Sequence, residues 1–355
     1  MRLRFLPKRM ARMLALLFFV TGGAVMSFSQ AGDFDQAMAL FRLKQWKEAA
    51  AAFAATDKMQ PGKTEALLFQ AKCLVNLGQF AAADMTLKEY IAGHPRSEDA
   101  GYLLAYAYFR EDKPRESLQQ FTAAAQLKTP TADDLKIVAL DYVLLNDYRD
   151  AGHYLEEALK MDPENVEVRY HLGRVRYQQN QFDEAIAAFQ DVLKRDPGNV
   201  KAQDNLGLSL EAENQLDRAI AEYRKAIALD EASTVHSEQP YLNLGALLSK
   251  ANKSEEASVL LLKAAEIDPK SSKIRYELGK AYFDLNRFDD SRKEEEEAVR
   301  LDAKNAAAHY LLGRVYQRTG KSDLAAQQFK LTDEMMRSPG ENSGTSPMPP
   351  PENHK

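Results

Sequence analysis

The stretch Val166–Asn199 reads VEVRYHLGRVRYQQNQFDEAIAAFQDVLKRDPGN and decides how the whole chain is organised. Its apolar residues follow helical spacing in two short segments, the first ending at Gln179 and the second beginning near Phe182. Asn180 lies in the polar turn between them, and Asp196-Pro197 stops the second segment because proline cannot continue a helix. The stretch therefore predicts two amphipathic helices joined by a tight turn.

The same pattern recurs along the chain with a period of 34 residues. A fixed period of this size predicts a stacked repeat array in which each unit buries its apolar face against its neighbours. The frame needs one correction, an insertion of four residues, Thr234–Ser237, between the sixth and seventh units. Nine units begin at Gln30, Thr64, Glu98, Ala132, Val166, Val200, Glu238, Ser272 and Ala306.

Three positions of the frame indicate close packing between the two helices of a unit. The eighth position is Ala in the first four units and Gly in the last five, and the twentieth is always Ala or Ser. The twenty-fourth position is large and apolar in eight units, with Glu295 as the exception. Glycine inside a helix costs about 1 kcal/mol relative to alanine, so its recurrence indicates that two helices approach closely there.

Two further positions mark where helices end. The fifteenth position is Gly or Asn in seven units, and these residues tolerate the left-handed conformation that ends a helix. The residues at this position are Lys44, Gly78, Asp112, Asn146, Asn180, Asn214, Asn252, Asn286 and Gly320. Proline at the thirty-second position is expected to close the second helix of five units, at Pro61, Pro95, Pro163, Pro197 and Pro269.

These units resemble tetratricopeptide repeats. The resemblance rests on the sequence DEAIAAF at Asp183–Phe189, on Asp-Pro pairs such as Asp196-Pro197, and on recurring Leu-Gly pairs. The Leu-Gly pairs are Leu172-Gly173, Leu206-Gly207, Leu244-Gly245, Leu278-Gly279 and Leu312-Gly313. The resemblance implies an all-α fold, a right-handed superhelical solenoid of about nine helix-turn-helix repeats over residues 32–337.

Residues 1–31 have the plan of a secretory signal peptide. An apolar run, Met13–Val20, precedes small residues spaced two apart at Ser27, Ser29 and Ala31, and basic residues come first, at Arg2, Arg4, Lys8, Arg9 and Arg12. We therefore expect an exported protein, periplasmic or secreted. The alternative is an inner-membrane anchor formed by residues 13–28, which is shorter than the ~20 apolar residues that a membrane span needs.

The charge balance of the remaining chain is acidic. The leader holds five of the 47 Lys and Arg residues and no acidic residue, so 42 basic residues face 52 acidic ones, a net charge of −10. This excess argues against general binding of nucleic acid or anionic membranes. The single cysteine, Cys73, allows no intramolecular disulfide and is expected to be buried. Residues 338–355 are rich in Pro, Ser and Gly and predict a disordered tail.

Four consecutive acids, Glu294–Glu297, lie in the predicted second helix of the eighth unit. Glu295 falls on the frame position that is otherwise large and apolar. We expect a solvated, locally weak helix that Arg292, Lys293 and Arg300 compensate in part. The eighth unit should then be the least stable in the C-terminal half.

No pattern in the sequence indicates catalysis. The six histidines are scattered without zinc-ligand spacing, and there is no nucleophile elbow of the G-x-S-x-G type. Gly320-Lys321-Ser322 lacks the earlier glycine and the preceding strand of a phosphate-binding loop. We therefore expect no enzyme, no cofactor and no metal site.

The resemblance also implies where a partner would bind. In tetratricopeptide arrays the first helices line a concave groove, mainly with frame positions five, nine, twelve and thirteen. Aromatic and basic residues stand together at these positions, which is the chemistry of peptide anchors. The candidate groove residues are Tyr102, Tyr106, Tyr170, Arg174, Tyr177, Tyr276, Lys280, Phe283, Tyr310, Arg314 and Arg318.

These candidate groove residues also have a second interpretation, which the sequence supports about as well as partner binding. The tyrosines would pack between helices, and the basic residues would only solubilise an acidic chain. A tyrosine followed four residues later by Arg or Lys in units five, eight and nine favours the groove. Some family members bind chaperone tails through Lys or Arg beside Asn, but here no basic residues align with Asn205 and Asn243.

The predicted function is that of a scaffold or adaptor which holds an extended or helical segment of a partner protein. Family analogy places such exported scaffolds in envelope assembly or secretion. The alternative is an accessory subunit of a polysaccharide or envelope export machine, whose tyrosines stack on the sugar rings of a glycan.

Overall fold

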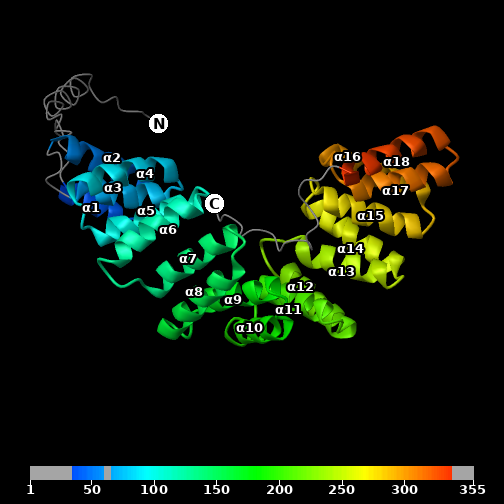
Figure 1. Cartoon of the computed structure of the whole chain (residues 1–355), viewed down its shortest axis with the longest axis horizontal. Helices are drawn as coiled ribbons and strands as arrows, with labels where there is room; N and C mark the ends of the chain where they lie inside the picture. The colour runs from blue at the N-terminus through cyan, green and yellow to red at the C-terminus, as the bar shows by residue number, and fades with distance from the viewer. Residues whose placement is uncertain (1–33, 60–64, 338–355) are drawn as a thin grey trace, which may run out of the picture. The chain divides into compact units, whose positions relative to one another are not determined.

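The computed structural model describes residues 34–59 and 65–337, which form eighteen α-helices and no strand (Figure 1). The first helices of the nine pairs are α1 (Phe34–Arg42), α3 (Ala66–Asn76), α5 (Glu98–Arg110), α7 (Ala132–Leu144), α9 (Val166–Gln178), α11 (Val200–Ala212), α13 (Gln239–Lys250), α15 (Ser272–Asp284) and α17 (Ala306–Arg318). The second helices are α2 (Trp46–Met59), α4 (Phe80–Gly93), α6 (Pro114–Ala125), α8 (Tyr148–Met161), α10 (Phe182–Arg195), α12 (Leu216–Glu231), α14 (Ser254–Ile267), α16 (Phe288–Leu301) and α18 (Ser322–Arg337).

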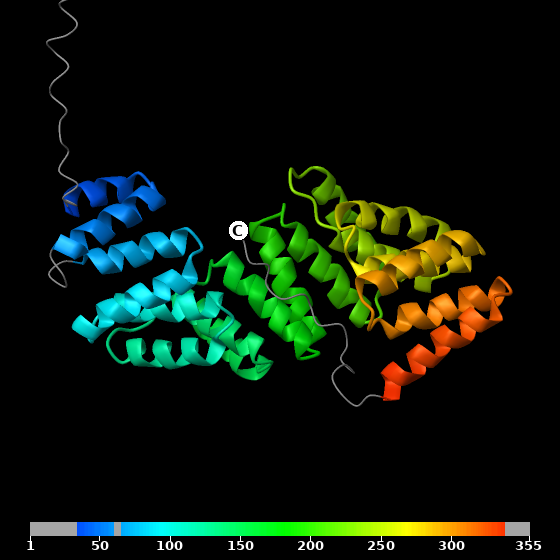
Figure 2. The same ribbon diagram turned by 90° about the horizontal axis from the view of Figure 1, so that it is seen from above.

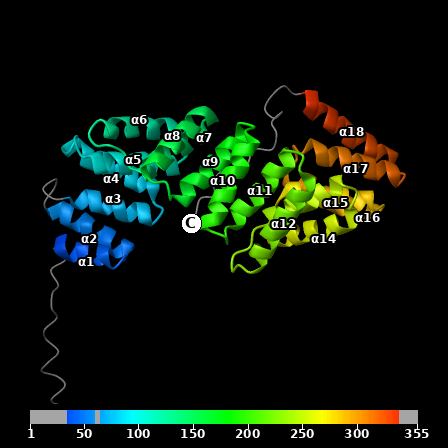
Figure 3. The same cartoon turned by 90° about the horizontal axis from the view of Figure 1, so that it is seen from below.

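The helices fall into two compact units, one ending at Thr129 and one beginning at Pro130. Within each unit a first helix packs on its own second helix, which packs on the next first helix. Figures 2 and 3 show the pairs of the second unit following one another in chain order from α7 to α18. The predicted leader and tail lie outside the described residues. None of the described helices is long and apolar enough to span a membrane.

The turn inside each pair has one conformation throughout. In the described chain, positive φ angles occur at the nine residues of frame position fifteen, from Lys44 (57°) to Gly320 (75°). Most of these residues are Asn or Gly, which adopt the left-handed conformation at low cost. Lys44 and Asp112 adopt the same conformation. The sequence prediction for this position is confirmed in every unit.

The small residues of frame position eight lie against the large residues of position twenty-four. A Cβ atom added to Gly173 would stand 2.8 Å from a ring carbon of Phe189, and one added to Gly207 would stand 2.7 Å from the ring of Tyr223. Real Cβ contacts are longer, so only glycine allows the helix and ring to approach this closely. This confirms the prediction that glycine occurs at frame position eight because the two helices of a repeat pack closely there.

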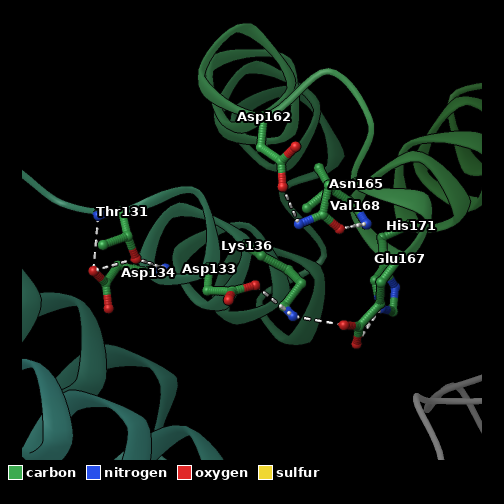
Figure 4. Close-up of polar contacts among 9 residues, drawn as sticks. All are labelled: Thr131, Asp133, Asp134, Lys136, Asp162, Asn165, Glu167, Val168 and His171. Carbon is green, nitrogen blue, oxygen red and sulfur yellow. Dashed lines mark hydrogen bonds and ion pairs between the residues drawn. The ribbon is translucent and has the colours of Figure 1, made fainter.

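Side-chain caps fix where the first helices begin. The Asn165 side chain accepts a hydrogen bond from the backbone N–H of Val168 at 3.0 Å (Figure 4). Thr131 and Asp134 form a reciprocal capping box at the start of α7, also drawn in Figure 4. Such caps satisfy donors that have no partner within the helix. They place the starts of α7 and α9 at the first position of the 34-residue frame.

The expectation for Glu295 was wrong. This side chain is fully buried against Gly279 of α15, and neither carboxylate oxygen has a hydrogen-bond donor in the described part of the chain. Burial raises the pKa of Glu295 to about 10. The helix points this residue inward because its frame position, rather than the polarity of its neighbours, sets its direction. The neighbouring acids pair as expected, in Arg292–Glu296 and Arg300–Glu297, and Arg275 pairs with Glu294.

The insertion between α12 and α13 is exposed to solvent, and hydrogen bonds to Asp230 hold its ends. Asp230 is 1% exposed, and its carboxylate accepts hydrogen bonds from the Ser237 backbone N–H at 2.7 Å and the Tyr241 hydroxyl at 3.3 Å. Val235, at the middle of the insertion, is 79% exposed. The inserted residues therefore form an anchored loop outside the helical core.

The first unit has its own core. Cys73 of α3 is fully buried, as predicted, and packs in a cluster with Ala49 and Phe53 of α2. Burial raises the pKa of its thiol to about 11, so the thiol stays protonated at neutral pH. Cys73 is therefore a packing residue.

Candidate functional site

The first helices form the inner layer of the second unit. Consecutive first helices contact one another along the series α7, α9, α11, α13, α15 and α17. In the described helices no two consecutive second helices approach each other to the same degree. A stack whose first helices are closer together than its second helices curves toward the first helices. We call their exposed surface at frame positions five, nine, twelve and thirteen the inner face.

Two of the predicted residues belong to the first unit. The Tyr102 ring meets the edge of Phe121 at a centroid distance of 5.5 Å, and its hydroxyl donates to the carbonyl of Lys128. The Tyr106 hydroxyl accepts a hydrogen bond from Arg110 at 2.9 Å. Both phenols are therefore engaged inside their own unit, as the packing interpretation expects.

The predicted residues on α9 are half-buried. Tyr170 packs on Phe189 at a centroid distance of 5.9 Å, and its hydroxyl accepts a hydrogen bond from the Asn205 amide at 3.2 Å. Tyr177 packs on Phe182 at 5.4 Å. Arg174 lies between these tyrosines on the same helix face, and burial lowers its pKa. On α9 the aromatic rings are half-buried and act mainly as packing residues.

The predicted residues on α15 form the floor of the inner face. Phe283 is 7% exposed and lies in a core cluster with Leu311 of α17. Tyr276 is half-buried beside them, and burial raises the pKa of its phenol to about 12. The Lys280 ammonium lies 3.6 Å from the Glu277 carboxylate of the same helix. These side chains support the residues that α17 presents.

The predicted residues on α17 are the most accessible. Tyr310 is 50% exposed, with one side of its ring toward Phe329. The guanidinium carbon of Arg314 lies 4.5 Å from the centre of the Phe283 ring. Arg318, one turn further along, is exposed. Spaced four residues apart, the three predicted residues of α17 form one stripe along the helix.

Sequence reasoning missed an ionic link between α7 and α9. The Lys136 ammonium bonds Asp133 at 3.1 Å and Glu167 at 2.7 Å, and the Glu167 carboxylate also approaches His171 at 3.8 Å (Figure 4). His171 and Lys136 lower the pKa of Glu167 to about 2. Burial lowers the pKa of His171, so its ring is neutral at neutral pH. The link neutralises Lys136 within the protein and connects two first helices.

A second link, between α11 and α13, was also missed. The Asn243 amide donates to both carboxylate oxygens of Asp204 at 3.0 Å, and Lys250 pairs with Glu211 at 3.0 Å. Asp204 is buried, and burial raises its pKa to about 7. The sequence contained a clue to this link, because Asp204 and Asn243 occupy positions five and six of the 34-residue frame in neighbouring units. Asn205 and Asn243 are thus both engaged in hydrogen bonds between neighbouring first helices.

In the part of the chain that the structure describes, no group of three or more His, Cys, Asp or Glu side chains is placed to hold a metal ion. The inner face offers two kinds of chemistry, phenol and phenyl rings and the guanidinium donors of α17. These groups suit recognition of an extended ligand by hydrogen bonds, charge and apolar contact.

Family profiles agree with this architecture. A tetratricopeptide repeat profile matches residues 34–83, 139–200 and 172–234, another matches 238–271, and a TPR repeat profile matches 279–320. The chain belongs to the tetratricopeptide repeat family, and its all-α repeat fold is the one predicted. Proteins of this family bind protein or peptide partners and are typically scaffolds without catalytic activity. Protein binding is therefore the general function of the chain.

Individual relatives are distant. The BBSome complex member BBS4 from Bos taurus is 24% identical over 253 residues, which are 71% of this chain and 41% of that protein. The chain thus spans less than half the length of this curated relative. The yeast Tom70 structure has a TM-score of 0.55 at 20% identity, covering 82% of this chain and 62% of that one. PilW, described as a widely conserved type IV pilus biogenesis factor, has a TM-score of 0.53 at 20% identity, covering 59% and 95%. These two likenesses show the fold.

Proposed function

We propose that this protein is an exported scaffold that holds a segment of a partner protein on the inner face of its second unit. The observation that carries the proposal is the stripe on α17, where a half-exposed tyrosine precedes two arginines at one-turn intervals. The leader pattern of residues 1–31 supports export, and the location that we propose is the periplasm or outside the cell. Envelope assembly or secretion is the setting that we propose for it.

The inner face is prepared for binding because its side chains are already held. Phe283 is in the core, the Arg314 guanidinium lies over its ring, and the ring of Tyr310 packs against Phe329. Side chains fixed before binding lose less conformational freedom when a partner arrives. Aromatic and arginine residues in such positions commonly carry most of the binding energy of an interface.

The same packing favours a protein partner over a glycan. Stacking on a sugar requires a free ring face. Tyr170 and Tyr177 are half-buried and pack at a tilt against Phe189 and Phe182, at centroid distances of 5.9 and 5.4 Å, which leaves them little free ring face. Tyr310 is the exception, because its ring is 50% exposed.

Site-specific photo-crosslinking in the native host tests the proposed surface. A photoreactive phenylalanine analogue replaces Tyr310 on the inner face or, as a matched control, Val259 on α14, which is 69% exposed. We expect a discrete crosslinked protein from position 310 and none from position 259. Crosslinking of the same protein at both positions, or only at 259, would contradict the proposed binding surface.

The mature N-terminus tests the proposed export. Protein recovered from the envelope fraction is extracted and its first residues are determined. A start at or near Gly32 would support cleavage of the leader. An intact leader in a protein that only detergent extracts would favour the anchor formed by residues 13–28, and an intact leader in a cytoplasmic protein would contradict export.

A further inference from the structure

The arginines of α17 differ from most arginines on the second helices. Arginines on the second helices are mostly neutralised by acids, such as Arg195 by Glu164 at 3.1 Å and Arg224 by Glu256 at 2.6 Å. In the described part of the chain, Arg314 and Arg318 have no carboxylate within ion-pair distance. This is notable in a chain with 52 acidic residues. The second unit therefore keeps two cations available on its inner face.

Arg314 is held in a fixed orientation. Its guanidinium lies over Phe283, which is itself 7% exposed. Stacking fixes the plane of the guanidinium and leaves its N–H donors directed outward at its edges. None of these donors meets an acceptor among the described residues.

Two other stacked arginines show what such a group normally does. Arg287 lies 4.3 Å from the centre of the Tyr282 ring and donates to Asp290 at 2.7 and 2.9 Å. Arg110 lies over Phe80 and donates to the Tyr106 hydroxyl. Arg314 has the same stacked arrangement without an acceptor. Its acceptor is therefore expected from outside the chain.

We propose that the α17 stripe binds an extended acidic segment of the partner protein, with side-chain carboxylates on alternate residues. This inference rests on the proposed function and names the chemistry of its partner. One carboxylate lies on Arg314 and the next on Arg318, and an apolar residue packs on Tyr310. A guanidinium binds a carboxylate through two parallel hydrogen bonds, which Lys cannot do.

The spacing of the stripe supports this geometry. Residues four apart in a helix are separated by about 6 Å along its axis. Alternate residues of an extended chain point the same way and are separated by about 6.6 Å. Two acids separated by one residue therefore match Arg314 and Arg318, and a third alternate residue reaches Tyr310.

Acidic residues of α15 limit where the partner's acids can lie. Glu277 is beside Lys280, and Asp284 is exposed on the same helix. Like charges close together are unfavourable. The acidic segment therefore lies along α17 rather than across to α15.

The test measures binding of fluorescent peptides to the full chain without its leader by anisotropy. Acetylated, amidated decapeptides carry one apolar residue and two Glu residues separated by one, two or three positions, so their only carboxylates are on side chains. We expect the alternate spacing to bind best, and its Gln counterpart to bind at least about tenfold more weakly. We expect a similar loss from Arg314→Ala, a substantial loss from Arg314→Lys, and no change from the matched control Arg287→Ala.

Three outcomes of the peptide measurements would overturn the inference. These are equal binding of the Glu and Gln peptides, no detectable binding of any peptide, and affinity unchanged in both Arg314→Ala and Arg318→Ala. Tighter, arginine-dependent binding of a polyuronate or a single-stranded oligonucleotide would also overturn it, in favour of that polymer. If position 310 crosslinks to a protein while the acidic peptides fail, the proposed function stands and only this inference fails.

Discussion

The fifth and eighth repeats have the same backbone design but carry residues of opposite polarity at buried frame position twenty-four, Phe189 and Glu295. Helices α9 and α15 both have 13 residues, α10 and α16 both have 14, and their turns contain Asn180 and Asn286 with the same φ of 59°. Gly173 faces the ring of Phe189, whereas Gly279 faces the carboxyl group of Glu295. The comparison shows that the helix pair forms from its turn and its small residues even when the central residue is unfavourable.

The difference has a cost that can be estimated. The unfolded chain loses the Glu proton near pH 4.5, whereas the folded repeat keeps it up to about pH 10. Each pH unit between these values costs about 1.4 kcal/mol, so at pH 7 the cost is roughly 3 kcal/mol. Because the folded-state pKa of Glu295 is raised, the contribution of this residue to stability is most favourable below pH 4.5 and becomes less favourable as the pH rises.

The largest expected effect comes from making the fifth repeat like the eighth. Phe189→Glu removes about 2–3 kcal/mol of apolar burial and adds roughly 3 kcal/mol for a buried acid, a loss of about 5 kcal/mol at pH 7. Amide hydrogen exchange over α9 and α10 would show the local opening. Exchange unchanged in these helices would contradict the account of position twenty-four.

A slightly smaller effect is expected from pH. Between pH 5 and pH 8 the penalty at Glu295 grows by about 4 kcal/mol, and Glu295→Gln should remove this dependence. Exchange over α15 and α16 should therefore accelerate with pH in the native protein more than in the variant, after correction for intrinsic exchange. Asp204, whose pKa is also raised, is present in both proteins and does not contribute to the difference. Parallel pH profiles would exclude a buried acid at this position.

Replacing Glu295 by a large apolar residue, as found at frame position twenty-four of the other repeats, should stabilise the eighth repeat. We expect Glu295→Leu to slow opening of α15 and α16 by the equivalent of about 3 kcal/mol at pH 7. Leu261 fills the same frame position in the seventh repeat and is fully buried, so the site accepts this side chain. A destabilised variant would mean that Glu295 has a partner that outweighs its burial.

The glycine contact gives a smaller effect. Gly173→Leu should force the ring of Phe189 aside and cost about 1–3 kcal/mol in the free energy of unfolding. Gly198→Leu is the control, because the atom nearest to an added Cβ there is 3.9 Å away. Denaturant unfolding of both variants checks this expectation, and equal losses would show that close packing at Gly173 is unimportant.

The smallest effect concerns the helix caps. Asn165→Ala removes the cap of α9 and should cost about 1 kcal/mol. Ser271→Ala removes the corresponding cap of α15, where the Ser271 hydroxyl accepts from the Ile274 N–H. Measured by hydrogen exchange, the two losses should be similar, because the caps do not depend on the residue at position twenty-four. A much larger loss in α15 would indicate that the buried acid also weakens the start of that helix.

These comparisons also show why the fold was predictable and the details of the site were not. Asn180 and Gly173 act within one repeat, so their spacing in the sequence reports their role directly. Glu295 misled the prediction because its acidic neighbours suggested solvent, whereas the frame directs it inward. The contacts of Arg314 with Phe283 and of Asp204 with Asn243 join neighbouring repeats. Such contacts depend on the distance between first helices, which sequence spacing alone does not give.

The anchored insertion at Asp230 has a practical consequence. Tyr170 and Asn205 join neighbouring first helices across 35 residues, and Asp204 and Asn243 occupy the same two frame positions across 39. The four added residues therefore do not change which frame positions pair between neighbouring first helices, and hydrogen bonds to the Asp230 carboxylate hold the end of the loop that contains them. Exposed loops with firmly held ends accept foreign sequence well. The tip at Val235 is thus a natural place to graft an epitope or a fluorescent reporter while the repeats on either side keep their alignment.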